Sequence, residues 1–216
     1  MEVKELDYPI LYSFRRCPYA MRARLSLLVS KQRVEIREVH LREKPQEFLK
    51  SSKSATVPCL LTNHETIDES LDIMIWALNL GDPFQWLKMP KLGYDLITQN
   101  DGPFKLALDR TKYHSRYPNE DPIKNREIAS KFVNELEIEM SGSYLFGCQA
   151  TLADMAILPF VRQFAFIDKE WFDRQPWPKV IAWLNNFISS KLYLNIQKKY
   201  DRWFPESKAM FFPEYH

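Results

Sequence analysis

The hydrophobic and polar positions of the first forty residues follow the periods of a strand, a helix and a second strand. Residues 8–14 form a mostly apolar run of strand character. From Pro18 to about residue 30, apolar residues recur at helical spacing. Residues 34–39 alternate apolar and charged positions, which is typical of a half-exposed strand. This order predicts a βαβ unit with two parallel strands.

The next forty residues continue with shorter elements. Residues 45–50 favour a short helix, and residues 56–61 and 66–67 favour a hairpin of two short strands. Pro58 should begin its strand, because proline cannot donate a hydrogen bond to a sheet. A helix is expected over residues 71–80, after acidic residues and a serine that favour a helix start. The first 80 residues therefore predict the order βαβ-ββα.

From residue 81 to the end of the chain, no segment alternates with the period of a strand, and the pattern predicts helices alone. The expected helices are residues 92–116 with a kink at Gly102-Pro103, 123–140, 152–166 and 178–188. The aromatic tail from Trp203 is expected to pack on the surface. We therefore predict a first domain over residues 1–80, a linker over 81–90 and an all-helical domain over 91–216.

One helix of the second half has both a start signal and an unusual composition. Thr151 and Asp154 have the spacing of a capping box, in which each side chain accepts from the backbone of the other residue. The run that follows, residues 152–166, is apolar almost all round. Such a helix is expected at the buried centre of a helical domain.

Composition narrows the class of protein. The 216 residues are 45% hydrophobic and 27% charged, as in ordinary soluble proteins, and the net charge of +2 gives no reason to expect nucleic acid. No apolar run approaches the ~18–20 residues that would span a bilayer, and residues 1–5 lack signal-peptide character. The scattered histidines predict no metal site. The three cysteines are widely separated, which predicts a reducing compartment, the cytoplasm.

Candidate chemistry gathers at Cys17. Pro18 is a residue favoured at the first position of a helix, so Cys17 should lie at or just before the helix start. The unpaired N–H groups and helix dipole there favour a negative charge, and a cysteine so placed should react as a thiolate. Arg15 and Arg16 add positive charge, while Arg22 and Arg24 point away from the apolar face of the helix and either serve the thiolate or lie in solvent. The alternative is a small buried cysteine without chemistry.

Four motifs in this order carry a resemblance to a known family: Cys17-Pro18-Tyr19-Ala20, Val57-Pro58, Glu69-Ser70 and Thr151-Leu152-Ala153-Asp154. With them, nearly the whole chain resembles the cytosolic glutathione transferases. It is most similar to the cysteine-type members, the omega class and related bacterial proteins. The resemblance implies a thioredoxin-like N-terminal domain and an all-α C-terminal domain. Glutathione would be the co-substrate, with no metal.

The resemblance also implies a set of glutathione-binding residues. The backbone of Val57, before a cis peptide bond to Pro58, would pair with the cysteinyl amide. Ser70 and Glu69 would bind the α-carboxylate and the α-amino group of the γ-glutamyl end. Lys44 would lie near the glycyl carboxylate, and Tyr19 would contact the tripeptide through its backbone. Some of these residues also have an ordinary structural explanation: Glu69-Ser70 as a helix cap, Lys44 as a solvated lysine and Pro58 as the limit of an edge strand.

Ala20 stands where a dithiol motif would carry its second cysteine, so the motif cannot close a disulfide of its own. We therefore expect thiol–disulfide exchange in which Cys17 takes up glutathione and a second glutathione releases it. The resemblance adds dehydroascorbate reduction and removal of glutathione from conjugates. One alternative is a conjugating transferase that uses the hydroxyl of Ser13 or Tyr12 on small electrophiles. Another is a non-catalytic interaction protein.

The two remaining cysteines are expected to be structural. Cys59 follows Pro58 and could act as a resolving thiol, but burial in its strand is the simpler expectation. Cys148 precedes the capping box. Family habit favours a homodimer, although no residue of this sequence requires one.

Overall fold

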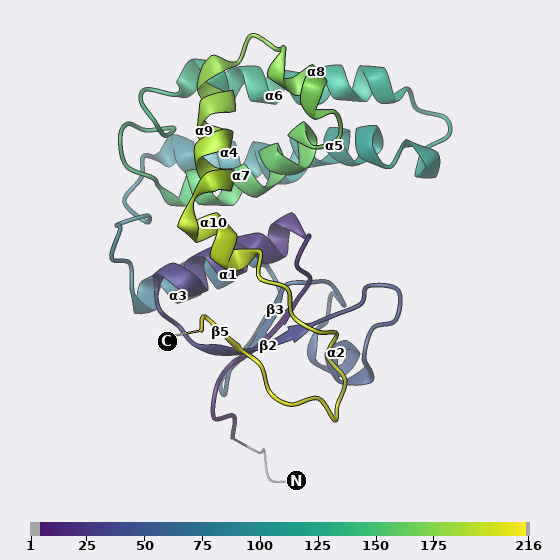
Figure 1. Cartoon of the computed structure of the whole chain (residues 1–216), viewed down its shortest axis with the longest axis vertical. Helices are drawn as coiled ribbons and strands as arrows, with labels where there is room; N and C mark the ends of the chain where they lie inside the picture. The colour runs from purple at the N-terminus through teal and green to yellow at the C-terminus, as the bar shows by residue number, and fades with distance from the viewer. Residues whose placement is uncertain (1–4, 215–216) are drawn as a thin grey trace. The chain divides into compact units, whose positions relative to one another are not determined.

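The computed structural model describes residues 5–214 and divides them into two compact units (Figure 1). The first unit comprises residues 5–84 together with residues 191–214, and the second comprises residues 85–190. The last part of the chain therefore makes its contacts in the first unit, which its helical pattern did not indicate. The domain boundaries expected from the sequence stay a prediction. Residues 1–4, which include most of the segment examined for a signal peptide, lie outside the described residues, as do residues 215–216.

The first unit is built on a mixed sheet. Strands β1 (Ile10–Ser13) and β2 (Val34–Glu38) are parallel, which confirms the predicted βαβ unit. Strands β3 (Cys59–Leu61) and β4 (Thr66–Ile67) form the predicted hairpin, and β3 runs antiparallel to β1. The strand order is β4-β3-β1-β2-β5.

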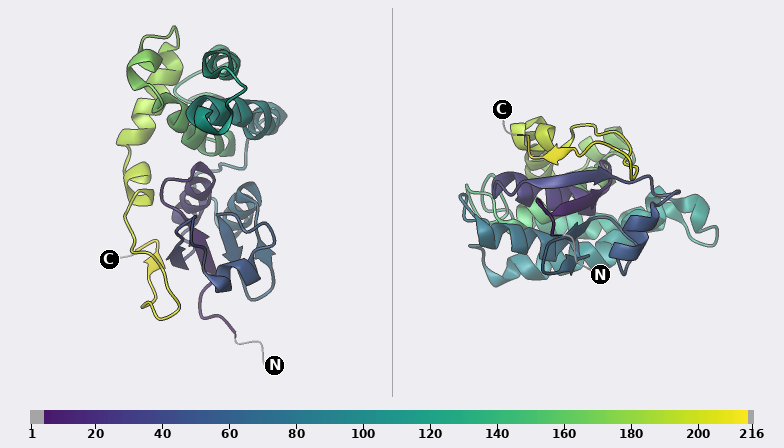
Figure 2. Two further views of the ribbon diagram at one scale, coloured as in Figure 1. Left: turned by 90° about the vertical axis from the view of Figure 1, so that its right-hand side faces the viewer. Right: turned by 90° about the horizontal axis from the view of Figure 1, so that it is seen from below.

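The fifth strand corrects the expectation that no strand follows residue 80. Strand β5 (Phe211–Phe212) pairs antiparallel with β2, with Phe212 opposite Val34. Figure 2 shows this segment, in yellow, running beside the sheet. The expectation of a surface tail was also wrong, because Trp203 is 4% exposed and packs in the core. A pairing between residues so far apart in sequence leaves no local pattern from which to predict it.

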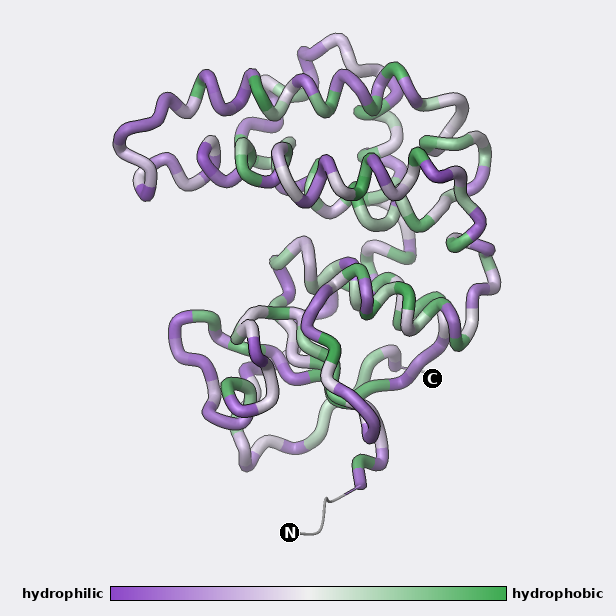
Figure 3. The backbone as a smooth tube through the Cα atoms, turned by 180° about the vertical axis from the view of Figure 1, so that it is seen from behind, coloured by the Kyte–Doolittle hydropathy of each residue, from purple (hydrophilic) through white to green (hydrophobic). Residues whose placement is uncertain are grey.

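Helices cover both faces of this sheet. On one face α1 (Pro18–Val29) packs against α3 (Ser70–Leu80) and α10 (Lys191–Ile196), and Figure 3 shows hydrophobic segments gathered where α1 and α3 meet. The short helix α2 (Gln46–Ser51) contributes Phe48 to a cluster on the other face. Buried members of that cluster include Tyr12, Val57 and Trp203. The amino end of α1 therefore begins beside a closed hydrophobic core.

The second unit is helical. Its elements are α4 (Lys91–Gln99), a π-helical turn (Asn100–Phe104), α5 (Lys105–Lys112), a 3-10 turn (His114–Arg116), α6 (Pro122–Glu139), α7 (Leu152–Ala165), α8 (Lys169–Asp173) and α9 (Pro178–Ser189). The predicted kink at Gly102-Pro103 lies inside the π-helical turn, since Pro103 cannot supply an N–H to a regular ladder. Among residues 5–214, no helix has the length and apolarity of a membrane span.

The predicted capping box is present at the start of α7. Asp154 Oδ2 accepts from the Thr151 backbone N–H at 2.8 Å and from the Thr151 hydroxyl at 2.7 Å, while Oδ1 accepts from the Leu145 N–H at 2.9 Å. Asp154 is fully buried, and this burial raises the pKa of its carboxyl against the opposing hydrogen bonds. Almost every residue of α7 is buried, as its apolar composition predicts.

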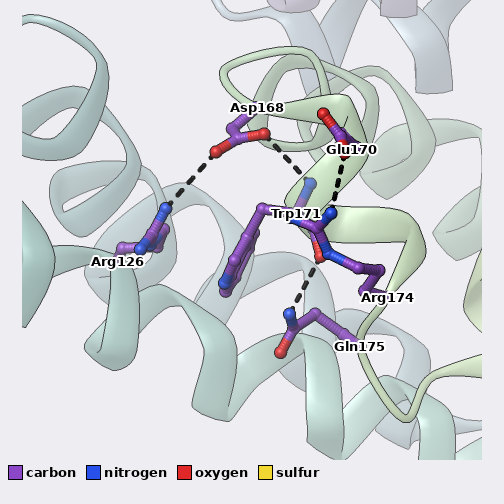
Figure 4. A network of polar contacts seen from close by, with 6 residues as sticks. All are labelled: Arg126, Asp168, Glu170, Trp171, Arg174 and Gln175. Carbon is purple, nitrogen blue, oxygen red and sulfur yellow. Dashed lines mark hydrogen bonds and ion pairs between the residues drawn. The ribbon is translucent and has the colours of Figure 1, made fainter.

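Helix α8 is tied to α6 by a polar network (Figure 4). Asp168 caps α8 by accepting from the Trp171 N–H at 3.0 Å and lies 3.8 Å from Nη1 of Arg126 on α6. The Arg126 guanidinium also stacks over the Trp171 ring at 4.3 Å. Trp171, Phe172 and Trp177 form edge and tilted ring contacts that close this end of the unit. The network accounts for the fold of α8, which the sequence pattern did not predict.

Candidate functional site

Cys17 is the N-cap residue of α1, as its position before Pro18 predicts. Its backbone is extended (φ −74°, ψ 124°), its N–H donates to the Phe14 carbonyl at 3.0 Å, and its own carbonyl accepts from Met21 at 2.9 Å. The side chain makes no capping hydrogen bond to the helix backbone and is half-buried. A sulfur at this point meets the N–H groups of the first helical turn, which favour negative charge.

The segment before β3 lies against Cys17. The Val57–Pro58 peptide bond is cis, as the resemblance implies. The Cys17 thiol donates to the Val57 carbonyl, with Sγ 3.6 Å from the oxygen. Cys17 also packs at the edge of the cluster that contains Val57 and Cys59. The structure thus brings together two of the expected site residues that lie 40 positions apart in the sequence.

Glu69 and Ser70 begin α3. Glu69 is the exposed N-cap residue, whereas Ser70 is buried at 3% exposure. Nη1 of Arg22 on α1 donates to Ser70 Oγ at 3.4 Å, and the Arg22 guanidinium lies 5.6 Å from the centre of the Tyr19 ring. The buried guanidinium of Arg22 therefore lies near both Tyr19 and Ser70, and so connects the start of α1 with the start of α3.

Asp68, which precedes this pair, fixes the loop before β3. Its carboxylate accepts from the Ser52 hydroxyl at 2.6 Å and from the Lys53 N–H at 3.0 Å. These hydrogen bonds lower the pKa of Asp68 against the opposing effect of burial. Asp68 thus connects the loop that leads to Val57 with the start of α3.

Lys44 is half-exposed in the loop between β2 and α2. It lines a hollow of about 390 Å³ together with Pro45, Arg202, Trp203 and Phe204. Arg202 is paired there with Glu43 through an Nη1–Oε2 distance of 2.7 Å. Lys44 is thus found beside the C-terminal segment, whereas Cys17 and Val57 contact each other elsewhere in the unit.

The burial of Arg22 and Arg24 corrects the expectation that both would point away from the helix's packed face. They are 0% and 1% exposed. Arg24 donates from Nε to the Ile196 carbonyl at 3.0 Å, from Nη2 to the Arg15 carbonyl at 2.7 Å, and from Nη1 to the Ser13 hydroxyl. Ile196 belongs to α10, whose return to α1 could not be predicted from the helical pattern of residues 18–30.

The electrostatics around Arg24 favour negative charge at Cys17. Desolvation lowers the pKa of Arg24 to about 10, and the negative charges of Glu38 and of an ionised Cys17 act in the opposite direction. Because such an interaction is mutual, the Arg24 cation favours the thiolate form of Cys17. The sequence analysis named Arg24 only as one of several arginines that either serve the thiolate or lie in solvent. It did not single out Glu38, which belongs to the regular alternation of β2.

The two alternative hydroxyls are buried and already hydrogen-bonded. Ser13 is 0% exposed and accepts from Arg24, and Tyr12 is 1% exposed with its hydroxyl 2.9 Å from Arg37 Nη1. Burial raises the pKa of the Tyr12 phenol against the opposing effect of Arg37. Neither hydroxyl faces a space that a bound thiol could enter in this structure.

The other cysteines differ from Cys17 in their surroundings. Cys59 is fully buried, and this burial, with a hydrogen bond to Asp68, raises the pKa of its thiol to about 12. Cys148 is exposed, which corrects the expectation of a structural residue. No disulfide joins any of the three cysteines, and among them only Cys17 combines partial burial with a helix start.

Solved structures share this fold. A glutathione transferase family member from Pseudomonas fluorescens Pf-5, crystallised with two glutathione molecules, has a TM-score of 0.75 at 17% identity, over 88% of this chain and 92% of that one. Glutathione transferase Omega 3C from Trametes versicolor has a TM-score of 0.73 at 18% identity, over 92% and 93% of the two chains. Glutathione S-transferase isozyme E7 from Drosophila melanogaster has a TM-score of 0.73 at 21% identity, over 88% of this chain and 90% of that one. The architecture is therefore that of the glutathione transferases, with a thioredoxin-like unit and a helical unit.

Sequence models of the family match both halves. The model of the glutathione S-transferase N-terminal domain matches residues 11–83, and that of the C-terminal domain matches residues 123–186. Since the two matches together span more than half of the 216 residues, the chain belongs to the glutathione transferase family.

Proposed function

We propose that this chain is a glutathione-dependent thiol transferase whose nucleophile is the thiolate of Cys17. The observation that carries the proposal is the position of Cys17: a half-buried sulfur at the N-cap of α1, 3.6 Å from the Val57 carbonyl oxygen. The buried cation of Arg24 favours charge at that sulfur. A thiolate stabilised at neutral pH is the species that attacks disulfides.

The conjugating alternative has less support. A transferase of that kind needs a hydroxyl that can donate a hydrogen bond to the sulfur of bound glutathione. Ser13 and Tyr12 are both buried and both accept hydrogen bonds from arginines instead. Because glutathione has no access to these buried hydroxyls, we assign them a structural role as acceptors for Arg24 and Arg37.

Glutathione is the proposed co-substrate, held along the first unit. The backbone of Val57 would pair with its cysteinyl amide, next to Pro58, and Lys44 would attract its glycyl carboxylate. Glu69 would bind the α-amino group, and Tyr19 would contact the tripeptide through its backbone.

The α-carboxylate of glutathione is the proposed ligand of Ser70. The hydroxyl oxygen of Ser70 accepts from Arg22, so its proton is free to donate to a carboxylate. The N–H groups at the start of α3 favour the same negative charge.

The proposed reaction has two exchange steps. The Cys17 thiolate attacks the glutathione sulfur of a mixed disulfide, forming a Cys17–glutathione disulfide and releasing the substrate as its thiolate, which takes a proton. The thiolate of a second glutathione then attacks the sulfur of the bound glutathione and releases oxidised glutathione and the Cys17 thiolate. In sum, the mixed disulfide and one free glutathione thiol give the substrate thiol and oxidised glutathione, so that one disulfide bond replaces another and one free glutathione is consumed in each turnover. Since Ala20 replaces a second motif cysteine, the second glutathione has to be the resolving thiol.

The test compares Cys17→Ala with wild type on a small glutathione mixed disulfide and on an aryl halide. Loss of the nucleophile should lower kcat/KM for the mixed disulfide by at least about 10³-fold, because covalent catalysis has no substitute here. Cys148→Ser, which removes an exposed thiol, is the matched control and should keep wild-type activity.

Three outcomes would contradict the proposal. Mixed-disulfide activity that survives Cys17→Ala would assign catalysis to another group. Conjugation of the aryl halide that survives Cys17→Ala but is lost in Ser13→Ala or in Tyr12→Phe would establish the conjugating alternative. Failure of the wild-type protein to bind immobilised glutathione would favour the interaction protein.

Two further properties belong to this proposal. A catalytic thiol that must stay reduced fits the cytoplasm, where glutathione is reduced. We also propose the homodimer that the family resemblance implies. Sedimentation equilibrium tests it, and a mass near 25.7 kDa at all concentrations would contradict it.

A further inference from the structure

Two side chains form hydrogen bonds to the backbone of Arg15, in the loop that leads into Cys17. The Arg15 backbone N–H donates to Glu38 Oε1 at 2.7 Å, and the Arg15 carbonyl accepts from Arg24 Nη2 at 2.7 Å. Charged side chains therefore bind both backbone polar groups of Arg15: Glu38, at the end of β2, accepts from its N–H, and Arg24, on α1, donates to its carbonyl. Because the Cys17 N–H bonds to Phe14, these contacts lie inside the turn that ends at Cys17.

Glu38 is an unusual residue for this position. Desolvation raises the pKa of its carboxyl, which the hydrogen bond from Arg15 and the charges of Arg24 and Arg15 oppose. Its second oxygen, Oε2, is buried and accepts no hydrogen bond. A carboxylate withdrawn from water in this way costs stability, so its presence needs another explanation.

The C-terminal segment covers Glu38. The Trp203 N–H donates to the Glu38 carbonyl at 2.9 Å, and Arg202 forms a parallel bridge to the same residue. Tyr200 faces Arg24 from the same segment, and burial raises the pKa of its phenol to about 12, so it is uncharged at neutral pH. The charged groups that act on Glu38 are therefore Arg24 and Arg15.

We infer that Glu38 is a positioning residue for the proposed thiolate: through its hydrogen bond to the Arg15 N–H, it keeps the turn closed and Cys17 at the start of α1. Glu38 does not touch the substrate. The inference rests on the proposed function for its catalytic consequence, but the state of the Cys17 thiol can be measured without turnover.

The test compares two variants that both lack the charge of Glu38 and differ in the acceptor alone. Glu38→Gln keeps an oxygen for the Arg15 N–H, whereas Glu38→Leu is similar in size and has none. Both are made with Cys148→Ser, so that alkylation by iodoacetamide reports Cys17, since Cys59 is buried. The matched control is Glu35→Leu, which removes a carboxylate from the same strand that pairs with Arg37 instead.

We expect the pH midpoint of Cys17 alkylation to lie at least about half a unit higher in Glu38→Leu than in Glu38→Gln, because the loosened turn moves the sulfur away from the helix N–H groups. In the mixed-disulfide assay, kcat should be about tenfold lower in Glu38→Leu than in Glu38→Gln, with a smaller change in KM. Glu35→Leu should keep the midpoint of the wild type.

Equal midpoints in Glu38→Leu and Glu38→Gln would overturn the inference, as would a midpoint shift of the same size in Glu35→Leu. If Glu38→Leu does not fold, Glu38→Asp replaces it, since its shorter carboxylate keeps the charge and gives up the contact with Arg15. A wild-type midpoint and kcat in Glu38→Asp would then overturn it. Failure of the proposed function is distinguishable, because it appears as activity in Cys17→Ala and leaves the alkylation comparison unchanged.

Discussion

Two helix starts in this molecule, those of α1 and α7, can both be located from the local sequence, but different groups satisfy their N–H donors. At α7, Thr151 and Asp154 fill the donors at the helix start, and the carboxylate also takes the Leu145 N–H. At α1, Cys17 occupies the cap position, makes no side-chain capping hydrogen bond and remains half-buried. A closed helix start contributes stability, while an open one is available for a charged sulfur. The comparison distinguishes a cap that stabilises its helix, at α7, from a cap position that can hold a reactive thiolate, at α1.

The largest effect on stability is expected at the closed start. Asp154→Ala leaves the buried N–H groups of Leu145 and Thr151 without their acceptor, so the free energy of unfolding should fall by about 3 kcal/mol. Urea titration followed by circular dichroism measures it. Asp168→Ala, which removes a half-exposed cap from α8, is the control and should cost about 1 kcal/mol. An equal loss in both variants would contradict the distinction between buried and exposed caps.

A second prediction concerns Cys59, the buried thiol beside the open start. Its pKa is raised from 9.0 to about 12 in the folded chain, so above pH 9 the unfolded chain releases a proton that the folded chain keeps. Stability from this group is therefore complete below pH 9 and is lost as the pH rises toward 12. Between pH 8 and 10, the wild type should lose about 1 kcal/mol more than Cys59→Ala.

The pH series on urea unfolding has a matched control. Cys148→Ala removes an exposed thiol and should keep the pH slope of the wild type. A wild-type slope in Cys59→Ala as well would mean that Cys59 ionises freely in the folded chain. The distinction between Cys59, whose thiol stays protonated in the core, and Cys17, whose thiol is proposed to react as a thiolate, would then be wrong.

The smallest effect is expected from closing the open start. Cys17→Ser supplies a hydroxyl that can accept from the first turn of α1, so the free energy of unfolding should rise by about 0.5–1 kcal/mol while the proposed activity is lost. Thermal unfolding of Cys17→Ser and Cys17→Ala measures the gain, because alanine has no capping group. No difference in stability between these two variants would contradict an open cap.

Local signals were sufficient for much of the fold. Pro18 located the start of α1, and the spacing of Thr151 and Asp154 located that of α7, because caps and helix starts depend on residues within one turn. Likewise, alternation over residues 34–39 located β2. The family resemblance supplied the cis bond at Val57–Pro58.

The missed features depend on distant partners. Arg24 is buried because Ile196 returns to it across most of the chain, and Trp203 is buried because it reaches the core beside Tyr12. The residues adjacent to Arg24 and to Trp203 in the sequence form no pattern from which these long-range contacts could be predicted. For the candidate site, the sequence indicated Cys17 and its neighbours, but the inferred role of Glu38 depends on a hydrogen bond from the Arg15 N–H, 23 positions away in the sequence.

The pairing of β5 with β2 has a consequence for how the protein is made. Because the ribosome synthesises the chain from its amino end, the sheet that supports Cys17 lacks its edge strand, and the core lacks Trp203, until residues 203–212 have been added. The N-terminal unit thus reaches its final form only after the helical unit has been synthesised.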